Sequence, residues 1–251
     1  MEIEIKPLAQ WIFESQWLEL LKSELAKRLP DKDVQLVIED NLTADYAMKI
    51  DGSSGRVILW VNIHERAYIE TIFKQSYLNA VIEHEINHLN PNVIFQHDTI
   101  PAPIQILKKQ GIITHNHVTM FLTDIFQNYL KEIYANSEMS AIGLRKYLEF
   151  EVYKLKETWS KRHGTYRMMW MLIAAYVEVC YNMIGELIPT ELSSIVATLL
   201  KHPIDASIYE QIKVTYRAMW NAVKAGQRNV NLLEETYQLN ELAQNQRNPF
   251  L

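Results

Sequence analysis

The sequence predicts an α+β fold that is mostly helical, and three observations lead to that expectation. Only seven glycines and eight prolines interrupt the 251 residues, so long helices are favoured. Segments typical of strands are confined to residues 34–40, 46–50 and 56–62, and the turn sequence DGSSG separates the last two. Beyond residue 116 the pattern is helical almost to the end of the chain. We therefore expect a short antiparallel sheet followed by an all-helical C-terminal half.

The order of the helices follows from apolar periodicity and from the residues that break it. The stretch from 65 to 88 contains no glycine or proline, and Pro91 should end its helix within a residue or two of His88. Residues 91–116 read as a long irregular connection. The helices that the pattern predicts cover residues 7–29, 65–88, 117–137, 138–160, 165–186, 190–201 and 205–226.

Three regions are expected along the chain. Residues 1–137 would form a compact core, residues 138–230 a helical region and residues 231–251 a polar tail, although one integrated domain is a second interpretation. The apolar run within 168–188 is interrupted by Glu178 after about ten residues, whereas a membrane span needs roughly 20. We interpret this run as a buried core helix, and we expect no contact with a membrane.

Composition indicates a globular protein without a broad basic surface. Hydrophobic residues make up 48% of the chain and charged residues 22%, and the net charge is −5. A nucleic-acid partner is therefore not expected. One cysteine cannot form an internal disulfide, and the N-terminal residues lack the pattern of a secretion signal, so we expect a cytoplasmic protein. The sequence does not indicate an oligomeric state.

One short motif carries chemistry. His84, Glu85 and His88 match the HExxH pattern of zinc proteases. Histidines four residues apart lie on the same helical face, so both imidazoles can reach one Zn²⁺ at about 2.1 Å. Glu85 projects to the side of His84, where it can act as the general base toward a water molecule. The alternative interpretation is a pair of core histidines with ordinary hydrogen-bond partners.

The surroundings of this motif resemble the zincin metallopeptidase superfamily. The segment VIEHEINHL follows the predicted strand RVILWVN, and zincins share a short sheet, an active-site helix and a second helix. The resemblance covers residues 33–137. It implies a zincin-like core fold, a hydrolase that cleaves a peptide or protein substrate, zinc bound by His84 and His88, and Glu85 as the catalytic base.

The third zinc ligand has two main candidates on the predicted helix 117–137. Asp124 lies in TDIFQNYL, which is similar to the D-x-x-x-N segment of metallopeptidase domains associated with VWA-like modules. Glu132 lies in EIYAN, which is similar to the E-x-x-A-N segment of ImmA/IrrE-like gluzincins. The two residues are two turns apart, about 12 Å along the axis, so they cannot both bind one ion. Asp124 is the first choice and Glu132 the second, and the remaining alternatives are His97, His115, His117 and Glu178.

Two other functions fit the same residues. The first is a regulatory or toxin-like metal-binding module that acts through a protein partner. The second is a metal-free helical scaffold in which the two histidines belong to the core. The main expectation remains zinc-dependent hydrolysis of peptide bonds by a cytoplasmic metalloprotease.

Overall fold

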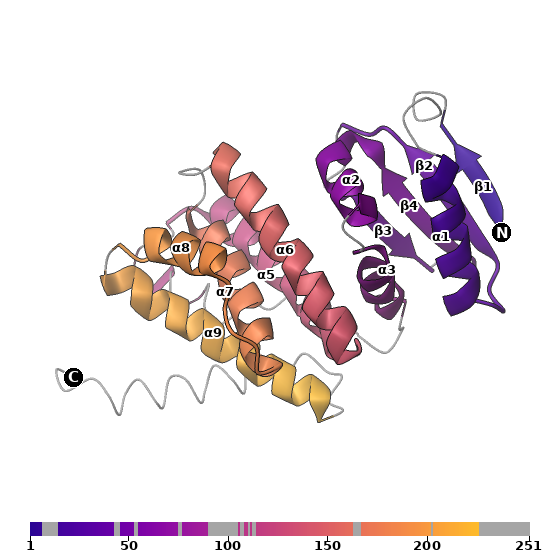
Figure 1. Cartoon of the computed structure of the whole chain (residues 1–251). Coiled ribbons are helices and arrows are strands. Elements are labelled where there is room, and N and C mark those ends of the chain that lie inside the picture. Colours follow the sequence, from indigo (N-terminus) through magenta and orange to yellow (C-terminus); the bar gives the residue numbers. More distant parts are fainter. Residues whose placement is uncertain are drawn as a thin grey trace. The chain divides into compact units, whose positions relative to one another are not determined.

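The computed structural model describes residues 1–6, 15–42, 46–52, 55–74, 77–89, 105, 108–109, 111, 114–162, 167–201 and 203–225. The chain divides into two compact units. The first comprises Met1–Asn90 with Glu138–Phe150, and the second comprises Pro91–Ser137 with Glu151–Leu251. The first unit holds the sheet and the second is helical (Figure 1). The predicted fold class, α+β and mostly helical, is confirmed.

A four-stranded sheet forms the centre of the first unit. Its strands are β1 (Glu2–Ile5), β2 (Val34–Glu39), β3 (Met48–Asp51) and β4 (Val57–Asn62). Figure 1 shows them in the order β1-β2-β4-β3. Strand β2 is parallel to both β1 and β4, and only β3 and β4 form an antiparallel pair.

The expectation of an antiparallel sheet was therefore wrong for two of the three pairings. Strand β1 was not predicted, although its sequence EIEI alternates as a strand does. The chain returns from β1 to β2 through helix α1 (Ser15–Arg28), and a helical crossover is what a parallel pair requires. The predicted hairpin does form between β3 and β4. Its turn contains Gly55 at a φ of 78°, a conformation that glycine adopts without strain.

The helices of the first unit cover the sheet and complete its core. Figure 1 shows α1 lying across one face. A short 3₁₀ turn, Ile63–Glu65, leads from β4 into α2 (Arg66–Lys74), and α3 (Leu78–Asn87) follows. Trp17 of α1 stacks on Phe73 of α2 with 4.9 Å between ring centroids. Fully buried aliphatic side chains of this unit include Leu21, Leu25, Leu36, Ile38, Leu59, Ile69 and Ile72.

The continuous helix predicted for residues 65–88 is instead two helices, α2 and α3. The amide of Tyr77 bonds to the carbonyl of Ile72, five residues back, instead of the carbonyl four residues back. This bond spans the break between α2 and α3. No glycine or proline marks the break, and the apolar periodicity continues across it, so the sequence analysis expected one helix.

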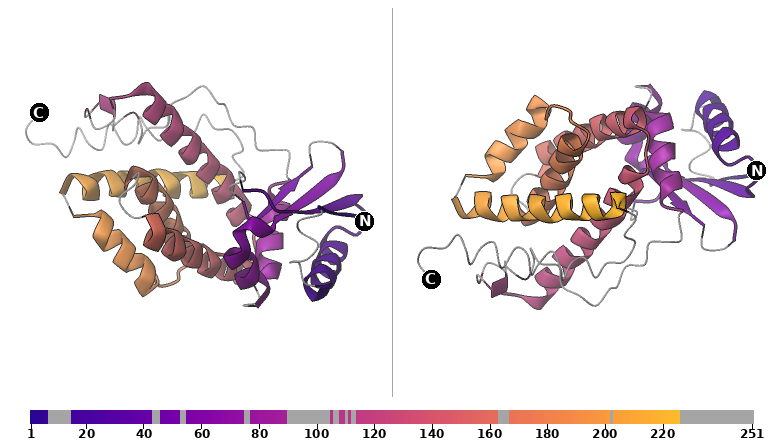
Figure 2. Two further views of the ribbon diagram at one scale, coloured as in Figure 1. Left: turned by 90° about the horizontal axis from the view of Figure 1, so that it is seen from above. Right: turned by 90° about the horizontal axis from the view of Figure 1, so that it is seen from below.

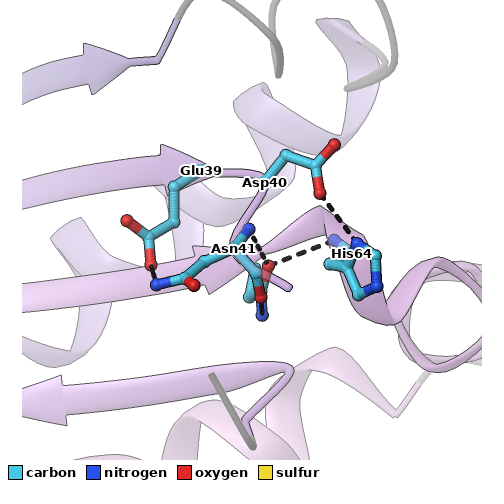
Figure 3. A network of polar contacts seen from close by, with 5 residues as sticks. Glu39, Asp40, Asn41 and His64 are labelled. Atoms are coloured by element: carbon cyan, nitrogen blue, oxygen red, sulfur yellow. Dashed lines mark hydrogen bonds and ion pairs between the residues drawn. The ribbon is translucent and has the colours of Figure 1, made fainter. Parts of the chain in front are cut away.

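Strands β2 and β4 end in a hydrogen-bonded polar network (Figure 3). Asn62 has no exposed surface, and its Oδ1 accepts hydrogen bonds from the backbone amides of Asn41 at 3.0 Å and His64 at 3.1 Å. Its Nδ2 donates to the carbonyl of Asn41. His64 in turn pairs with Asp40 at 3.0 Å. A buried amide bonded at both ends is a structural element of the fold, and it fixes how the chain leaves β4.

The second unit is a bundle of helices around α7. Its members are α5 (Asn116–Ser137), the part of α6 (Ala141–Arg162) beyond Phe150, α7 (Arg167–Met183), α8 (Thr190–Leu199) and α9 (Pro203–Lys224). Helix α7 packs against α5, α8 and α9, and Figure 2 shows α8 and α9 (orange and yellow) from two further sides. The predicted helices from residue 117 onward are thus present, with ends shifted by a few residues.

Helix α7 contains the apolar run that was interpreted as a core helix. Eleven of its side chains are buried, from Trp170 to Tyr181. Among the described residues, no helix combines the length and the hydropathy needed to cross a membrane. The division of the chain differs from the predicted boundary at residue 137, because α5 groups with the helical unit. The predicted tail, residues 231–251, lies outside the described residues.

Candidate metal centre

Helix α3 brings the two histidines of the motif together. The Nε2 atoms of His84 and His88 are 3.0 Å apart, and the ring planes are nearly perpendicular, at 86°. His84 is 1% exposed, and it continues a buried face of α3 that includes Ala80 and Val81. Their spacing of one helical turn accounts for this arrangement. Both rings therefore direct the same nitrogen toward one point.

The helix ends where the sequence predicts, which places the second histidine at its C-terminus. His88 is the C-cap residue of α3, and its amide bonds to the carbonyl of Glu85 at 3.1 Å. The amide of Leu89 bonds to Ile86 in the same three-residue pattern. This tighter final turn is a common way to satisfy the last carbonyls of a helix. His88 remains half-buried.

The distance between the imidazoles fits either of two chemical states. A neutral imidazole has one donor and one acceptor nitrogen, so His84 and His88 can share one hydrogen bond at 3.0 Å. Two nitrogens bound to one tetrahedral Zn²⁺ at about 2.1 Å would lie about 3.4 Å apart. A small rotation of either ring covers that difference. The donor set therefore fits a divalent transition metal without a change of backbone.

Glu85 is held by the edge strand of the sheet. Its Oε2 accepts a hydrogen bond from the backbone amide of Ile50 in β3, at 3.2 Å. Glu85 is half-buried, and it lies directly after His84 in α3. The hydrogen bond leaves the carboxylate able to accept further donors, since each oxygen has two lone pairs. A carboxylate that is oriented in this way can take a proton from a water molecule beside it.

Two further residues surround His84, and the sequence analysis did not identify them. Tyr147 of α6 stacks on the His84 ring, with 3.9 Å between centroids and 12° between planes. Glu83 accepts a hydrogen bond from the backbone amide of Ser140, at 2.7 Å. Both contacts join segments about 60 residues apart, so no local pattern could indicate them.

The two main candidates for a third ligand both lie on α5, in the second unit. Asp124 is exposed, whereas Glu132 is half-buried and precedes the buried run Ile133–Ser137. Within this run Asn136 has no exposed surface, and its side-chain amide donates to the hydroxyl of Tyr176 at 2.5 Å. The E-x-x-A-N segment thus has its last two residues in the helical core.

The remaining candidates are less suited to bind a metal or lie outside the description. Both oxygens of Glu178 accept hydrogen bonds in the second unit, one from Lys213 at 2.7 Å and one from Tyr209 at 2.8 Å. His115 is exposed. His97 and the side chain of His117 are outside the described residues.

Cys180 is not a candidate ligand. It is a free thiol without exposed surface. Burial raises the pKa of Cys180 to about 12, so the thiol stays protonated at neutral pH. A metal would bind the thiolate form.

Comparison with known proteins adds no assignment to this geometry. Neither the protein-family models, nor the curated proteins, nor the solved structures contain a match to the chain.

Proposed function

We propose that the protein is a zinc-dependent peptidase that hydrolyses peptide bonds. The observation that carries the proposal is the arrangement on α3, where His84 and His88 face one another at 3.0 Å and Glu85 lies between them in sequence. The HExxH pattern requires this spacing, and the helix end at His88 supports it. The resemblance to zincins adds the class of reaction.

We further propose Glu132 as the third ligand, in place of the first choice Asp124. Asp124 is exposed on α5, whereas Glu132 is half-buried. Two histidines and one glutamate are a ligand set found in catalytic zinc sites, which keep the fourth position for water.

The residues of the chain have separate roles in the proposed reaction. Zn²⁺, when bound, lowers the pKa of its water toward about 7 and polarises the substrate carbonyl. Glu85 accepts the proton of the attacking water and later donates it to the leaving amine, so the proton balance closes. The hydrogen bond from Ile50 keeps the Glu85 carboxylate oriented. The substrate is a peptide or protein, and we propose that it is cleaved in the cytoplasm, where the lone buried thiol of Cys180 fits a reducing environment.

The substitution Glu85→Gln tests the reaction. Loss of the carboxylate should abolish hydrolysis of an unstructured protein such as casein, while the zinc content measured by elemental analysis stays at one equivalent. Glu19→Gln is the matched control, because Glu19 is an exposed glutamate paired only to its helical neighbour Lys22 among the contacts described. Equal turnover by Glu85→Gln and wild type would refute the assignment of the base.

Zinc content distinguishes the proposal from its two alternatives. Protein purified without a metal-affinity tag should contain one equivalent of zinc. A content near zero, also after dialysis against Zn²⁺, would leave His84 and His88 as a hydrogen-bonded pair in a metal-free scaffold. Stoichiometric zinc without hydrolysis of any protein substrate would favour the regulatory metal-binding module.

The third ligand is tested by a matched pair of variants on one helix. Glu132→Ala should lower zinc affinity by more than the 10–100-fold that loss of a supporting group typically costs, and Asp124→Ala should leave it unchanged. Competition with a chromogenic chelator measures both. The opposite ranking would restore Asp124, and no effect of either variant would place the third ligand elsewhere.

A further inference from the structure

The face of the His84 ring is covered by Tyr147. The centroids are 3.9 Å apart and the planes differ by only 12°, so the two rings lie flat against each other. Tyr147 is 5% exposed and His84 is 1% exposed. A flat neighbour prevents the imidazole from tilting out of its plane. The direction in which His84 points its Nε2, toward His88, is thereby restricted.

The position of Tyr147 depends on how the N-terminus of α6 is capped. Ser140 precedes α6, and its hydroxyl accepts a hydrogen bond from the amide of Gly143 at 3.1 Å. Its own amide donates to Oε1 of Glu83 at 2.7 Å. In an ordinary capping box, the carboxylate comes from the third residue of the same helix. Here that position is Gly143, and α3 supplies the carboxylate.

Gly143 leaves the space that Glu83 occupies. A Cβ atom at this position would lie 2.4 Å from Oε2 of Glu83, far closer than van der Waals contact. Gly143 and Tyr147 are four residues apart, so they lie on the same face of α6. Glu83 and His84 are neighbours on α3. The hydrogen bonds that fasten α6 to Glu83 therefore also bring Tyr147 to the level of His84.

We propose that Tyr147 is a positioning residue for the metal ligand His84, and that the cap formed by Glu83, Ser140 and Gly143 sets its place. The inference deepens the proposed metal site and rests on it. The aromatic face of Tyr147, more than its hydroxyl, restricts the orientation of the His84 imidazole. Groups that orient a metal-bound histidine typically change metal affinity by 10–100-fold when removed.

The test compares ring removal with ring retention at one position. Tyr147→Leu should weaken Co²⁺ binding by about 10–100-fold and change the visible absorption of the bound ion, because the His84 ring gains freedom. Tyr147→Phe keeps the ring face and should retain both affinity and spectrum. Phe150→Leu is the matched control: Phe150 is a buried aromatic residue one turn further along α6 that packs on Tyr77.

The outcomes separate positioning from packing. Tyr147→Leu with wild-type affinity and spectrum would overturn the proposal, and so would an equal loss of affinity in Phe150→Leu. If Tyr147→Leu does not fold, Gly143→Ala replaces it: displacement of Glu83 should weaken Co²⁺ binding by several-fold, and an unchanged affinity would contradict the role of the cap.

A metal-free measurement distinguishes this inference from the proposed function. If the wild type binds no Co²⁺, the peptidase proposal fails, and NMR of the histidine ring protons then tests the stacking alone. The His84 protons should show an upfield ring-current shift that Tyr147→Phe keeps and Tyr147→Leu loses. Absence of that shift from the wild type would overturn the positioning role itself.

Discussion

Each of the two units contains a polar cluster with at least one buried member, and the two clusters differ in how their members pair. In the second unit, the carboxylate of Glu178 meets the ammonium of Lys213 at 2.7 Å, and Tyr209 bonds to its other oxygen. In the first unit, His84 and His88 are groups of the same kind, 3.0 Å apart. An acid and a base satisfy each other, whereas two imidazoles share either one proton or one cation. Buried polarity alone therefore does not indicate a site, whereas two like groups that one cation can bridge are a candidate for one.

The ammonium group of Lys213 is charged at neutral pH. Burial acts to lower the pKa of Lys213, but its hydrogen bonds to Glu178 and Glu210 outweigh burial, and the pKa is raised. A raised pKa contributes stability that is fully present below the unfolded value of roughly 10.4 and is lost as the pH rises through the folded value. The contribution of this cluster is thus intact at pH 7.

The largest expected effect comes from breaking this pair. Lys213→Met leaves Glu178 buried without its cation, and the free energy of unfolding should fall by about 3–5 kcal/mol. Urea unfolding at pH 7 measures it. Glu210→Gln removes the exposed partner of the same ammonium group, so it should cost only about 0–1 kcal/mol. Similar losses in both variants would contradict a dominant role for the buried contact.

A smaller change in the free energy of unfolding is expected when metal is added to the His84–His88 pair. Zn²⁺ at 100 times its dissociation constant should stabilise the protein by about 2.7 kcal/mol, because the ion binds the folded state. Thermal unfolding with and without Zn²⁺ measures the increment. His88→Ala should lose it and Lys213→Met should retain it. If Zn²⁺ still stabilised His88→Ala, the zinc would bind at another site. The His84–His88 pair would then not differ from the Glu178–Lys213 pair in binding a cation.

The smallest expected effect concerns the cap beside His84. Alanine is favoured over glycine by about 1 kcal/mol within a helix, but Gly143→Ala must displace Glu83 from a charge-assisted hydrogen bond. Since such a bond contributes about 1.5–3 kcal/mol, the net loss should be about 1 kcal/mol. In a Glu83→Ala/Ser140→Ala background, which removes the two side-chain groups nearest to the new Cβ, the same substitution should become stabilising. Destabilisation in both backgrounds would show that neither side chain is the cause.

The success of the sequence analysis depended on whether a signal was local. The helix end at His88 was predicted correctly because Pro91 restricts the backbone immediately before it. The helices beyond residue 117 were predicted because short polar or glycine-containing breaks separate them. The division of 65–88 into α2 and α3 was missed, since neither glycine nor proline accompanies it. The parallel pairing of β2 was missed because pairing depends on distant segments.

The same distinction applies to the candidate site. The spacing of His84 and His88 requires only one helix, and helical geometry then aligns their rings. The contacts of Tyr147 and Glu83 join segments about 60 residues apart, and no local sequence pattern in either segment predicts the other. The choice between Asp124 and Glu132 could not be made from spacing, because both resemblances lie on a single helix.

The sequence by itself determined the mostly helical fold class, the ends of most helices and the pair of histidines on successive turns. These features follow from backbone geometry and side-chain periodicity over a few residues. Only the tertiary structure decided the order of the strands, the ring that covers His84 and the cap that holds it. Those arrangements depend on which distant surfaces bury each other, and the hydrophobic effect that drives this burial is non-directional, so no short segment specifies its partner.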